Sequence, residues 1–482
     1  MLMTLLLVKV LKKVFFQEKY KFPPGPPALP LIGNVQMLGR PGLMKNLDFA
    51  DAYGDMHTIT LFGRKQVVIS SMEALRECNL EHSDTFNHRP TWMKALVNFS
   101  PGIIFRGIGR YEANKKFVST NLKKHGMGKS EMESRIINEI EDVMSLVERA
   151  EPLNPLGLME TYSANVICYL CFGKTWPYEK NNTNVYQEAL KQMHKLSETL
   201  ILADFLSFLK VMPAIKSKFE EYKKKVNVLR DLGRRTLQEK QDKDVMYGLS
   251  FESFDLADDF LADHNNNPTQ EAIKNFEEIA QDMFTAGVLT TAATLTFSII
   301  QLVNKPIVQE KLFMEIKTYL GDRNEATMSD IKNLPYMEGF MHEILRVYPA
   351  VPFIPHAIHT DTKLRDFYLP AGTYVAINSC SINNNPNIFP NPNEFDPSRW
   401  LDHDGMFKTS MKDQIITFGK GKRSCIGKSL ARMEIFLMLI KLLRKYKLGV
   451  PKGAKLPSCT PYFDVAVFTP DDFELEVTIR EY

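Results

Sequence analysis

The sequence of 482 residues lacks a marked excess of charge of either sign, because 60 lysines and arginines face 57 aspartates and glutamates. A general nucleic-acid binder would carry a strong basic excess, so no nucleic-acid partner is expected. Six cysteines are too few for a secreted scaffold held by disulfides, which favours reduced thiols in a cytosol-facing protein. With 44% hydrophobic and 24% charged residues, the chain fits neither wholesale disorder nor a protein with many membrane spans.

Hydrophobic periodicity predicts a mainly α fold with a small β component. Helical spacing of apolar residues dominates from Lys129 to Phe284, and two short alternating segments, His57–Phe62 and Gln66–Ser70, predict strands. Length alone suggests about three domains. However, no internal repeat is visible, and no linker after residue 34 is long enough to separate a second domain. We therefore expect one large domain over residues 35–482.

The first residues, 1–22, predict a short membrane-associated anchor. Met1–Val8 is apolar, and three lysines then gather on one side of a helical wheel, which is the pattern of a helix lying in the membrane interface. At about 1.5 Å per residue, eleven residues span about 16 Å of a hydrocarbon core about 30 Å thick, which argues against a full crossing. A cleaved signal peptide and a shortened membrane anchor are the alternatives.

Residues 23–34 hold five prolines within their first eight positions and cannot form a helix. Such a segment is stiff and extended, and its place after a basic amphipathic start predicts a hinge that orients a globular body on a membrane. An ordinary linker and a ligand for a proline-binding module are the alternatives.

Met283–Val303 is a run of 21 residues without a charge, long enough to cross a membrane. Its many threonines, with Ser298 and Gln301, make it more polar than lipid-facing sequence, so a long helix buried in a globular core is the better interpretation. Within it, the pair Ala286-Gly287 would let a bulky group approach the helix backbone closely.

The most specific pattern is the cysteine loop, Phe418–Gly427, which reads F-G-K-G-K-R-S-C-I-G and precedes a predicted helix. Its alternate glycines permit a tight loop whose amides point at a sulfur, and the helix N-terminus after Cys425 favours a thiolate. Arg423, two residues earlier, could meet an anion on the same side. These features predict a deprotonated cysteine bound to a metal. A phosphate-cradling glycine loop and a buried structural cysteine are the alternatives.

The cysteine loop resembles the signature of the cytochrome P450 haem–thiolate monooxygenases, F-G-x-G-x-R-x-C-x-G, at all six specified positions. The resemblance implies haem b (heme) as cofactor, with its iron held by the thiolate of Cys425. It also implies a propionate contact for Arg423 and a place for Phe418 in the cofactor-binding loop. The likeness covers most of the chain, and segments such as His125–Lys129 are closest to the animal microsomal branch.

Ala286-Gly287-Val288-Leu289-Thr290-Thr291 resembles the family motif A/G-G-x-D/E-T-T, on the helix over the distal haem face. By that resemblance Ala286 and Gly287 belong to the catalytic site, where the glycine makes room for dioxygen, and the Thr290 hydroxyl relays protons. Leu289 departs from the motif, because the family has an acid at this position. The departure removes the acid of the usual proton route, but it does not by itself remove monooxygenase chemistry, because water can reach the threonine by other paths.

Three further residues are assigned to haem by the resemblance. Tyr111 and Lys115 stand where the family usually has W-x-x-x-R, with both residues on a propionate. Each retains a hydrogen-bond donor, but lysine lacks the two-pronged fork of arginine. His356, after Pro355, matches a strand position that sends a histidine to a propionate, although taken alone it reads as an ordinary polar residue.

Glu343–Arg346 matches the family's E-x-x-R helix motif, and Arg399 supplies a later arginine. Residues three apart share a helix face, so Glu343 could satisfy both guanidinium groups in a buried network. A surface ion pair is the alternative.

The resemblance implies a monooxygenase that inserts one oxygen atom of O₂ into a lipophilic substrate, such as a xenobiotic, a steroid or a fatty acid. No G-x-G-x-x-G dinucleotide fingerprint is present, so the electrons must come from another protein. The family points to the NADPH–cytochrome P450 reductase, with cytochrome b5 as a second candidate. A basic face that includes Lys422 and Lys428 is expected to steer this partner, although such lysines are often only solvated charges.

The expected location is the endoplasmic reticulum membrane, with the catalytic domain facing the cytosol. Two rival functions stay open. One is a haem–thiolate isomerase or dehydratase that acts on peroxides without a reductase, which Leu289 favours and Thr290 opposes. The other is a non-catalytic haem-binding protein or sensor, because a fold does not fix an activity.

Overall fold

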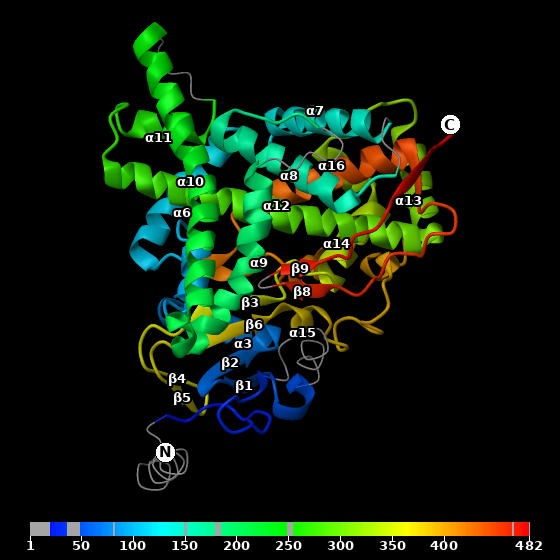
Figure 1. Ribbon diagram of the computed structural model, residues 1–482. Helices are drawn as coiled ribbons and strands as arrows, with labels where there is room; N and C mark the ends of the chain where they lie inside the picture. The colour runs from blue at the N-terminus through cyan, green and yellow to red at the C-terminus, as the bar shows by residue number, and fades with distance from the viewer. Residues whose placement is uncertain are drawn as a thin grey trace, which may run out of the picture. The chain divides into compact units, whose positions relative to one another are not determined.

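The computed structural model describes residues 20–35, 49–80, 82–148, 152–178, 185–247, 254–464 and 467–481. Nearly all of the predicted anchor, residues 1–22, lies outside the described residues. The chain is 58% helix and 12% strand, which confirms the predicted mainly α class (Figure 1). Its contacts define two compact units, Met1–Pro90 with Ile354–Asn378 and Thr91–Phe353 with Ser379–Tyr482.

The first unit is built on a four-stranded sheet with the strand order β1-β2-β6-β3. β1 and β2 are antiparallel and joined by a two-residue turn, Phe62-Gly63, whereas β2 and β6 are parallel. The apolar side chains of Val67, Val68 and Ile69 are buried. The elements of this unit are β1 (Met56–Leu61), β2 (Arg64–Ile69), α3 (Met72–Leu80), α4 (Ser83–Phe86), β3 (Phe353–Ala357), β4 (Thr362–Leu364), β5 (Phe367–Leu369) and β6 (Tyr374–Asn378).

The proline-rich segment is bonded along β1. The Pro24 carbonyl accepts the Thr58 amide at 2.8 Å, and the buried Asn34 bonds the Thr60 backbone through its own amide at 2.6 Å and its side-chain oxygen at 2.9 Å. A Cβ at Gly25 would overlap the Thr58 carbonyl oxygen, so glycine is needed for this close approach. The segment therefore covers the outer edge of the sheet, while its predicted role as a hinge on a membrane stays a prediction.

The second unit is an assembly of helices around α12 (Gln270–Asn304). α12 packs most extensively against the helix Pro155–Phe172 and also contacts Pro213–Tyr247 and Lys428–Lys445. Besides α12, the α-helices of this unit are α5 (Lys94–Phe99), α6 (Ile108–Lys124), α7 (Ser130–Val147), α8 (Pro155–Phe172), α9 (Val185–Phe205), α10 (Pro213–Tyr247), α11 (Leu256–Asp263), α13 (Pro306–Leu320), α14 (Pro335–Val347), α15 (Ser379–Asn383) and α16 (Lys428–Lys445).

Short elements complete the second unit. β7 pairs with β10 and β8 pairs with β9, both antiparallel. These strands are β7 (Tyr446–Gly449), β8 (Tyr462–Asp464), β9 (Val467–Thr469) and β10 (Glu476–Ile479), and the 3-10 helices are η2 (Ser207–Val211), η3 (Met328–Asn333), η4 (Pro397–Trp400), η5 (Thr409–Gln414) and η6 (Gly421–Arg423).

α12 contains the uncharged run and is a core helix, as predicted. Among the described residues it is the one helix long and apolar enough to cross a membrane, yet most of that stretch is buried inside the protein. Two of its buried hydroxyl groups are satisfied within the helix, because Thr296 and Ser298 each donate to the carbonyl four residues earlier at 2.8 Å. Such bonds allow a threonine-rich helix to lie in an apolar core.

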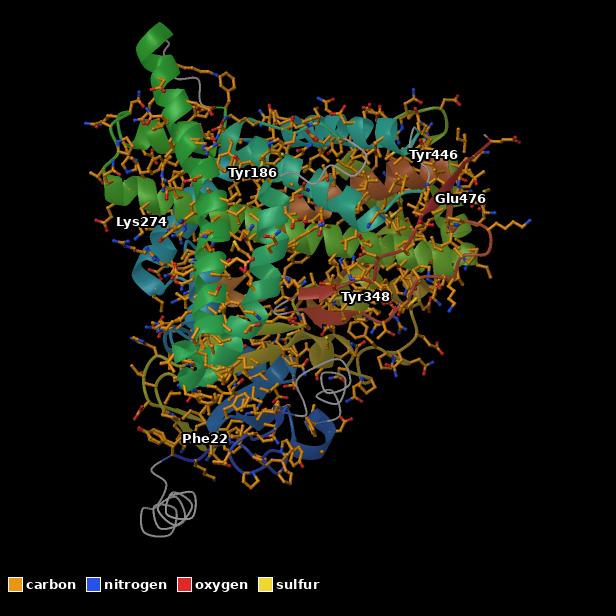
Figure 2. The ribbon with its side chains drawn as sticks, viewed as in Figure 1. Phe22, Tyr186, Lys274, Tyr348, Tyr446 and Glu476 are labelled. Atoms are coloured by element: carbon orange, nitrogen blue, oxygen red, sulfur yellow. The ribbon has the colours of Figure 1, made fainter. Side chains whose placement is uncertain are left out.

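Tyr348, labelled in Figure 2, joins the end of α14 to α12. Its ring stacks on Phe297 with 4.4 Å between centroids. Its hydroxyl accepts the Gln301 amide at 2.5 Å and donates to the Cys459 carbonyl at 3.0 Å. The contact fixes the helix that carries the E-x-x-R motif against the central helix.

Candidate active site

Cys425 is presented just before α16 by a loop that is closed on itself. Its amide donates to the Phe418 carbonyl at 2.8 Å. Gly419 and Gly421 have φ values of 67° and 79°, a left-handed backbone that favours glycine. This requirement explains the glycines at alternate positions. The loop leaves the Cys425 side chain exposed.

Opposing effects act on the Cys425 thiol. Although its surface is partly open, the thiol sits deep in the loop, and this burial raises the pKa of Cys425. The backbone amides of Gly427 and Lys428 and the positive charge of Lys115 lower the same pKa by a smaller amount. In the chain alone, burial therefore outweighs the thiolate-favouring amides that the sequence pattern predicted. A coordinated metal ion deprotonates a thiol, and the amides then stabilise the anionic sulfur.

Arg423 is a buried cation beside the cysteine. Its guanidinium donates to the carbonyls of Ile103 at 3.3 Å and Arg106 at 2.8 Å, and its carbon lies 3.4 Å from the centre of the Tyr111 ring. Burial lowers the pKa of Arg423 to about 10. A guanidinium in this position can also donate to an anionic group of a cofactor.

Tyr111 and Lys115 lie one turn apart on α6 and point at the cysteine loop. The Tyr111 hydroxyl donates to the Lys422 carbonyl at 2.7 Å, and the Lys115 ammonium donates to the same oxygen. The two residues expected to contact a propionate are thus brought beside Arg423. The arrangement also adds a contact that the sequence did not indicate, namely a shared backbone acceptor.

The motif on α12 forms an open stretch of an otherwise buried helix. Ala286 is exposed and Leu289 and Thr290 are half-buried, whereas the residues from 291 to 303 are all buried. The Thr290 hydroxyl donates to the Ala286 carbonyl at 2.7 Å, the usual bond of a helical threonine, and its oxygen keeps the capacity to accept. A Cβ at Gly287 would overlap the Ile167 side chain of α8, so this glycine is also required for helix packing.

Glu343 is the centre of the predicted buried network. Both Glu343 and Arg346 are fully buried, and two parallel bonds of 2.8 Å join them. Arg399 donates to Glu343 at 2.9 Å, which confirms the three-membered network, and Trp400 adds an indole N–H at 2.9 Å that the sequence analysis missed. The surface ion pair is therefore excluded.

Asn383 connects this network to the cysteine loop. Arg346 donates to the Asn384 side chain at 2.6 Å, next to Asn383 on the chain. The Asn383 side chain accepts the Ile416 amide at 2.9 Å and donates to the Thr417 hydroxyl at 3.1 Å. These bonds hold the residues just before Phe418, so the E-x-x-R network positions the entry of the loop.

His356 lies on β3 in the other unit, as its predicted strand position requires. The residue is buried, and its Nδ1 lies 2.9 Å from the Phe86 carbonyl oxygen. This bond fixes the ring orientation. Its contact with a propionate stays a prediction.

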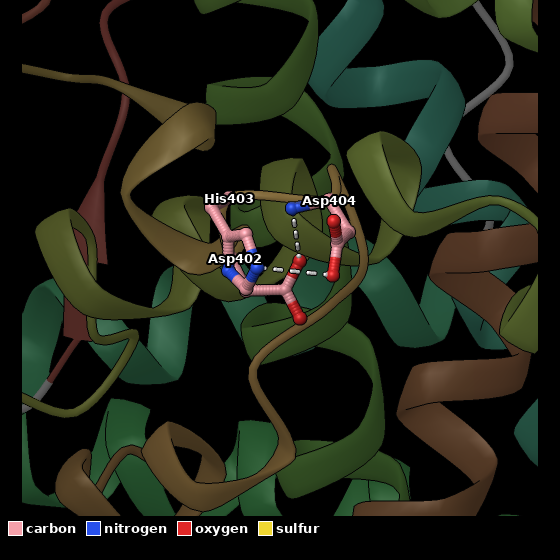
Figure 3. Close-up of side chains that lie close together, drawn as sticks. All are labelled: Asp402, His403 and Asp404. Atoms are coloured by element: carbon pink, nitrogen blue, oxygen red, sulfur yellow. Dashed lines mark hydrogen bonds and ion pairs between the residues drawn. The ribbon is translucent and has the colours of Figure 1, made fainter.

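Asp402, His403 and Asp404 come together in a turn after η4 (Figure 3). Among the described residues they form the one group of three possible metal-ligating side chains within reach of a single ion. One Asp402 oxygen already accepts the amides of Asp404 and Met406 at 3.0 and 2.9 Å, which builds the turn. The His403–Asp404 pair, 3.3 Å apart, is largely exposed. These residues therefore stabilise a surface turn.

Comparison with known proteins gives the class of this fold and site. Residues 23–477 match the family model described as Cytochrome P450, and the chain belongs to the cytochrome P450 family. The match runs through both compact units as one family domain. The chain is thus a cytochrome P450 monooxygenase, an oxidoreductase whose family uses a haem with thiolate-ligated iron, redox partners and lipophilic substrates.

The chain is similar to curated animal proteins that are all named as Cytochrome P450 2C enzymes. The chain is 31% identical to Cytochrome P450 2C41 of Canis lupus familiaris over 467 residues, which cover 95% of this chain and 94% of the relative. It is 30% identical to Cytochrome P450 2C6 of Rattus norvegicus over 468 residues, or 94% of each chain. Cytochrome P450 2C25 of Mesocricetus auratus is 28% identical over 484 residues, or 98% of each chain.

Proposed function

We propose that this chain binds haem b through Cys425 and oxidises a lipophilic substrate with electrons from an NADPH-dependent reductase. The residues fit the cofactor in three respects. Cys425 is exposed among sulfur-directed amides, the buried guanidinium of Arg423 lies beside the cysteine loop and can donate to an anion, and α12 has an open stretch at Ala286. When bound, haem supplies the activation of dioxygen for insertion of one oxygen atom into the substrate.

The chain's own residues have separable roles in this proposal. Cys425 holds the iron, and Phe418 and the loop glycines keep its sulfur in place. Arg423, Tyr111, Lys115 and His356 are assigned to the propionates, because each carries a donor for a carboxylate. The one donor of Tyr111 bonds the Lys422 carbonyl in this structure, so its contact with a propionate requires an exchange of that partner. Thr290 holds a proton on its Oγ1, and Ala286 and Gly287 shape the helix beside it.

The exposed cysteine before α16 is the observation that carries the proposal. Reduced protein treated with carbon monoxide should give the Soret band of a thiolate-ligated haem. Cys425→Ser should abolish that band, whereas Cys459→Ser, which changes the other exposed thiol, should retain it. A wild-type protein without the band would end the proposal.

The electron donor is proposed from charge around the cysteine loop. Lys422, Lys428, Lys116 and Lys123 are exposed on the loop, on the start of α16 and on α6. A positive surface of this kind would steer the acidic flavin domain of NADPH–cytochrome P450 reductase, and cytochrome b5 is a second candidate donor.

Charge reversal tests whether this surface, rather than the overall charge of the protein, attracts the reductase. Lys422→Glu with Lys428→Glu should raise the KM for the reductase at low salt. The matched control is Lys452→Glu with Lys455→Glu, two exposed lysines past the other end of α16, which is about 27 Å long. Equal KM values for the two double variants would contradict the proposed docking of the reductase on this surface, but not the proposed binding of haem.

The isomerase alternative keeps one specific observation in its favour. Leu289 places an apolar, half-buried side chain directly before Thr290. An isomerase would form product from a hydroperoxide without NADPH or reductase, whereas the proposed monooxygenase requires both. Turnover measured with and without the reductase distinguishes the two.

We also propose an endoplasmic reticulum location with the catalytic domain facing the cytosol. An exposed apolar patch on η2 and its flanks supports contact with a membrane surface; we call it the η2 patch. Phe208 and Val211 are 65% and 71% exposed, and the nearby Leu202 and Met212 are also exposed. Exposed apolar side chains in one short stretch typically mark an interaction site.

A further inference from the structure

Residues 100–106, here called the bracket segment, connect α12 to the cysteine loop. On one side, Oδ2 of Asp282 accepts the amides of Ile103 and Ile104 at 2.6 and 2.8 Å. On the other side, the carbonyl of Ile103 accepts the Arg423 guanidinium at 3.3 Å. One residue, Ile103, therefore bonds to the central helix through its N–H and to the arginine beside the cysteine through its C=O.

Other contacts of the bracket segment also join it to Arg423 and to α12. The Arg106 carbonyl accepts Arg423 at 2.8 Å, and the Arg106 side chain pairs with Glu278 of α12 at 3.3 Å. The Gly102 carbonyl accepts the Asn114 amide at 2.7 Å. A Cβ at Gly102 would overlap the Glu278 carbonyl oxygen, so the segment lies directly on the α12 backbone.

Asp282 is 1% exposed, and this burial disfavours the charged form of its carboxyl group. Burial raises the pKa of Asp282 to about 7, and the amides of Ile103 and Ile104 oppose that rise. A buried carboxyl group that accepts hydrogen bonds rigidifies the groups that donate to it. The groups it fixes are the backbone amides of the bracket segment.

We propose that Asp282 is a positioning residue for Arg423, because it holds the bracket segment on α12 and so fixes the carbonyls that orient the guanidinium. The inference rests on the proposed contact of Arg423 with a haem propionate. A cofactor-binding side chain keeps its geometry through partners of this kind, and their loss typically weakens binding. Asp282 thus couples α12 to the cysteine loop through four hydrogen bonds, two from the bracket segment to its carboxylate and two from Arg423 to the carbonyls of the segment.

The test uses the full haem-loaded chain and two readouts other than turnover. Asp282→Asn should speed amide hydrogen exchange at Ile103 and Ile104. It should also speed haem release to an excess of an apo-globin acceptor by about tenfold. The control is Asp204→Asn: Asp204 is also buried, on α9, where its Oδ2 accepts the Ala95 amide at 2.7 Å and its Oδ1 accepts the Lys210 ammonium at 2.6 Å, and it has no bond to the bracket segment among the described contacts. Its haem release should stay within about twofold of wild type.

A double-mutant cycle asks whether Asp282 acts through Arg423. Arg423→Lys should speed haem release, because lysine cannot donate to both carbonyls as the arginine fork does. Adding Asp282→Asn should then change the rate little, since the guanidinium that it orients is gone. Additive effects in the double variant, or unchanged release in Asp282→Asn, would overturn the inference.

The outcomes separate this inference from the proposed function. A wild-type chain that never binds haem contradicts the proposed function. A wild-type chain that binds haem but is insensitive to Asp282→Asn contradicts only the positioning role. If Asp282→Asn does not fold, Gly102→Ala displaces the bracket segment while the Asp282 side chain itself is unchanged, and the same cycle with Arg423→Lys gives the answer.

Discussion

The guanidinium carbon of Arg423 lies 3.4 Å from the centre of the Tyr111 ring, and the hydroxyl of that ring bonds the Lys422 carbonyl. A cation over an aromatic face is stabilised by about 2 kcal/mol when the pair is desolvated. The family usually has tryptophan at the position of Tyr111, so this chain keeps an aromatic face and gains a hydroxyl. The pair fastens α6 to the cysteine loop.

Two substitutions at Tyr111 separate the ring from the hydroxyl. Tyr111→Phe keeps the ring under Arg423 and should lower the free energy of unfolding by about 1 kcal/mol, because one hydrogen bond is lost. Tyr111→Ala removes the buried ring as well and should cost about 3–5 kcal/mol. Chemical denaturation of both variants measures the difference. Equal losses would show that the ring contributes nothing beyond its hydroxyl.

Neutralising the centre of the E-x-x-R network should be far more damaging than neutralising a surface pair. Glu343→Gln leaves two buried guanidinium groups without an anion and should lower the free energy of unfolding by about 3–5 kcal/mol. The control is Glu310→Gln, whose 53% exposed side chain pairs with Arg480, and which should cost less than about 1 kcal/mol. Thermal unfolding midpoints that fall equally would contradict the special role of Glu343.

His57 should make the protein sensitive to acid. Its side chain is buried in β1, and burial lowers the pKa of His57 to about 4 from an ordinary value of 6.5. Between these two pH values the unfolded chain binds the proton and the folded chain does not, so stability falls as the pH drops from about 6.5 to about 4.

His57→Phe should remove part of that pH dependence. The wild type should lose up to about 3 kcal/mol over this range through His57, and the variant should not. The control for the substitution itself is His403→Phe, which changes an 89% exposed histidine. Parallel stability curves for wild type and His57→Phe would refute the prediction.

Leu289→Glu restores the acid that the family motif contains. If proton supply to Thr290 limits coupling, the variant should form more product per NADPH consumed, because a general acid would stand beside the threonine. Leu289→Gln, of the same size but without an acid, should not. Product and NADPH measured together decide the point, and an unchanged ratio in Leu289→Glu would show that protons already reach Thr290 by another path.

The η2 patch should enter a membrane surface. In the full chain, Phe208→Trp should gain fluorescence quenching by vesicles of brominated phosphatidylcholine, beyond that of the parent chain. Ile307→Trp on α13, at a position 76% exposed, serves as the control and should gain none. Quenching of both or of neither would leave the η2 patch without a role in membrane contact.

Sequence reasoning succeeded where the informative residues are close together along the chain. The cysteine loop is a set of consecutive residues, the core helix is one uncharged run, and Glu343 and Arg346 are a single turn apart. Spacing therefore predicted the buried core helix and the pairing of Glu343 with Arg346, whereas the role of Cys425 as haem ligand follows from the resemblance and stays a prediction.

Contacts between distant segments could not be predicted in the same way. Asp282 bonds Ile103, 179 residues away, and Trp400 donates to Glu343, 57 residues away. Neither residue carries a local pattern, because an aspartate on a helix and a tryptophan after an arginine are common on any surface. Only the packing of the fold shows that Asp282 is buried and which amides it meets.

The bonding of the proline-rich segment along β1 has a practical consequence for anyone who shortens this gene to make the enzyme easier to crystallise. A reading frame that starts after Asn34 would strip the outermost strand of its bonded neighbour and leave its amides open to strands of other molecules. The expected result is aggregation in the expression host. A shortened reading frame should therefore keep the residues from Pro24 to Asn34.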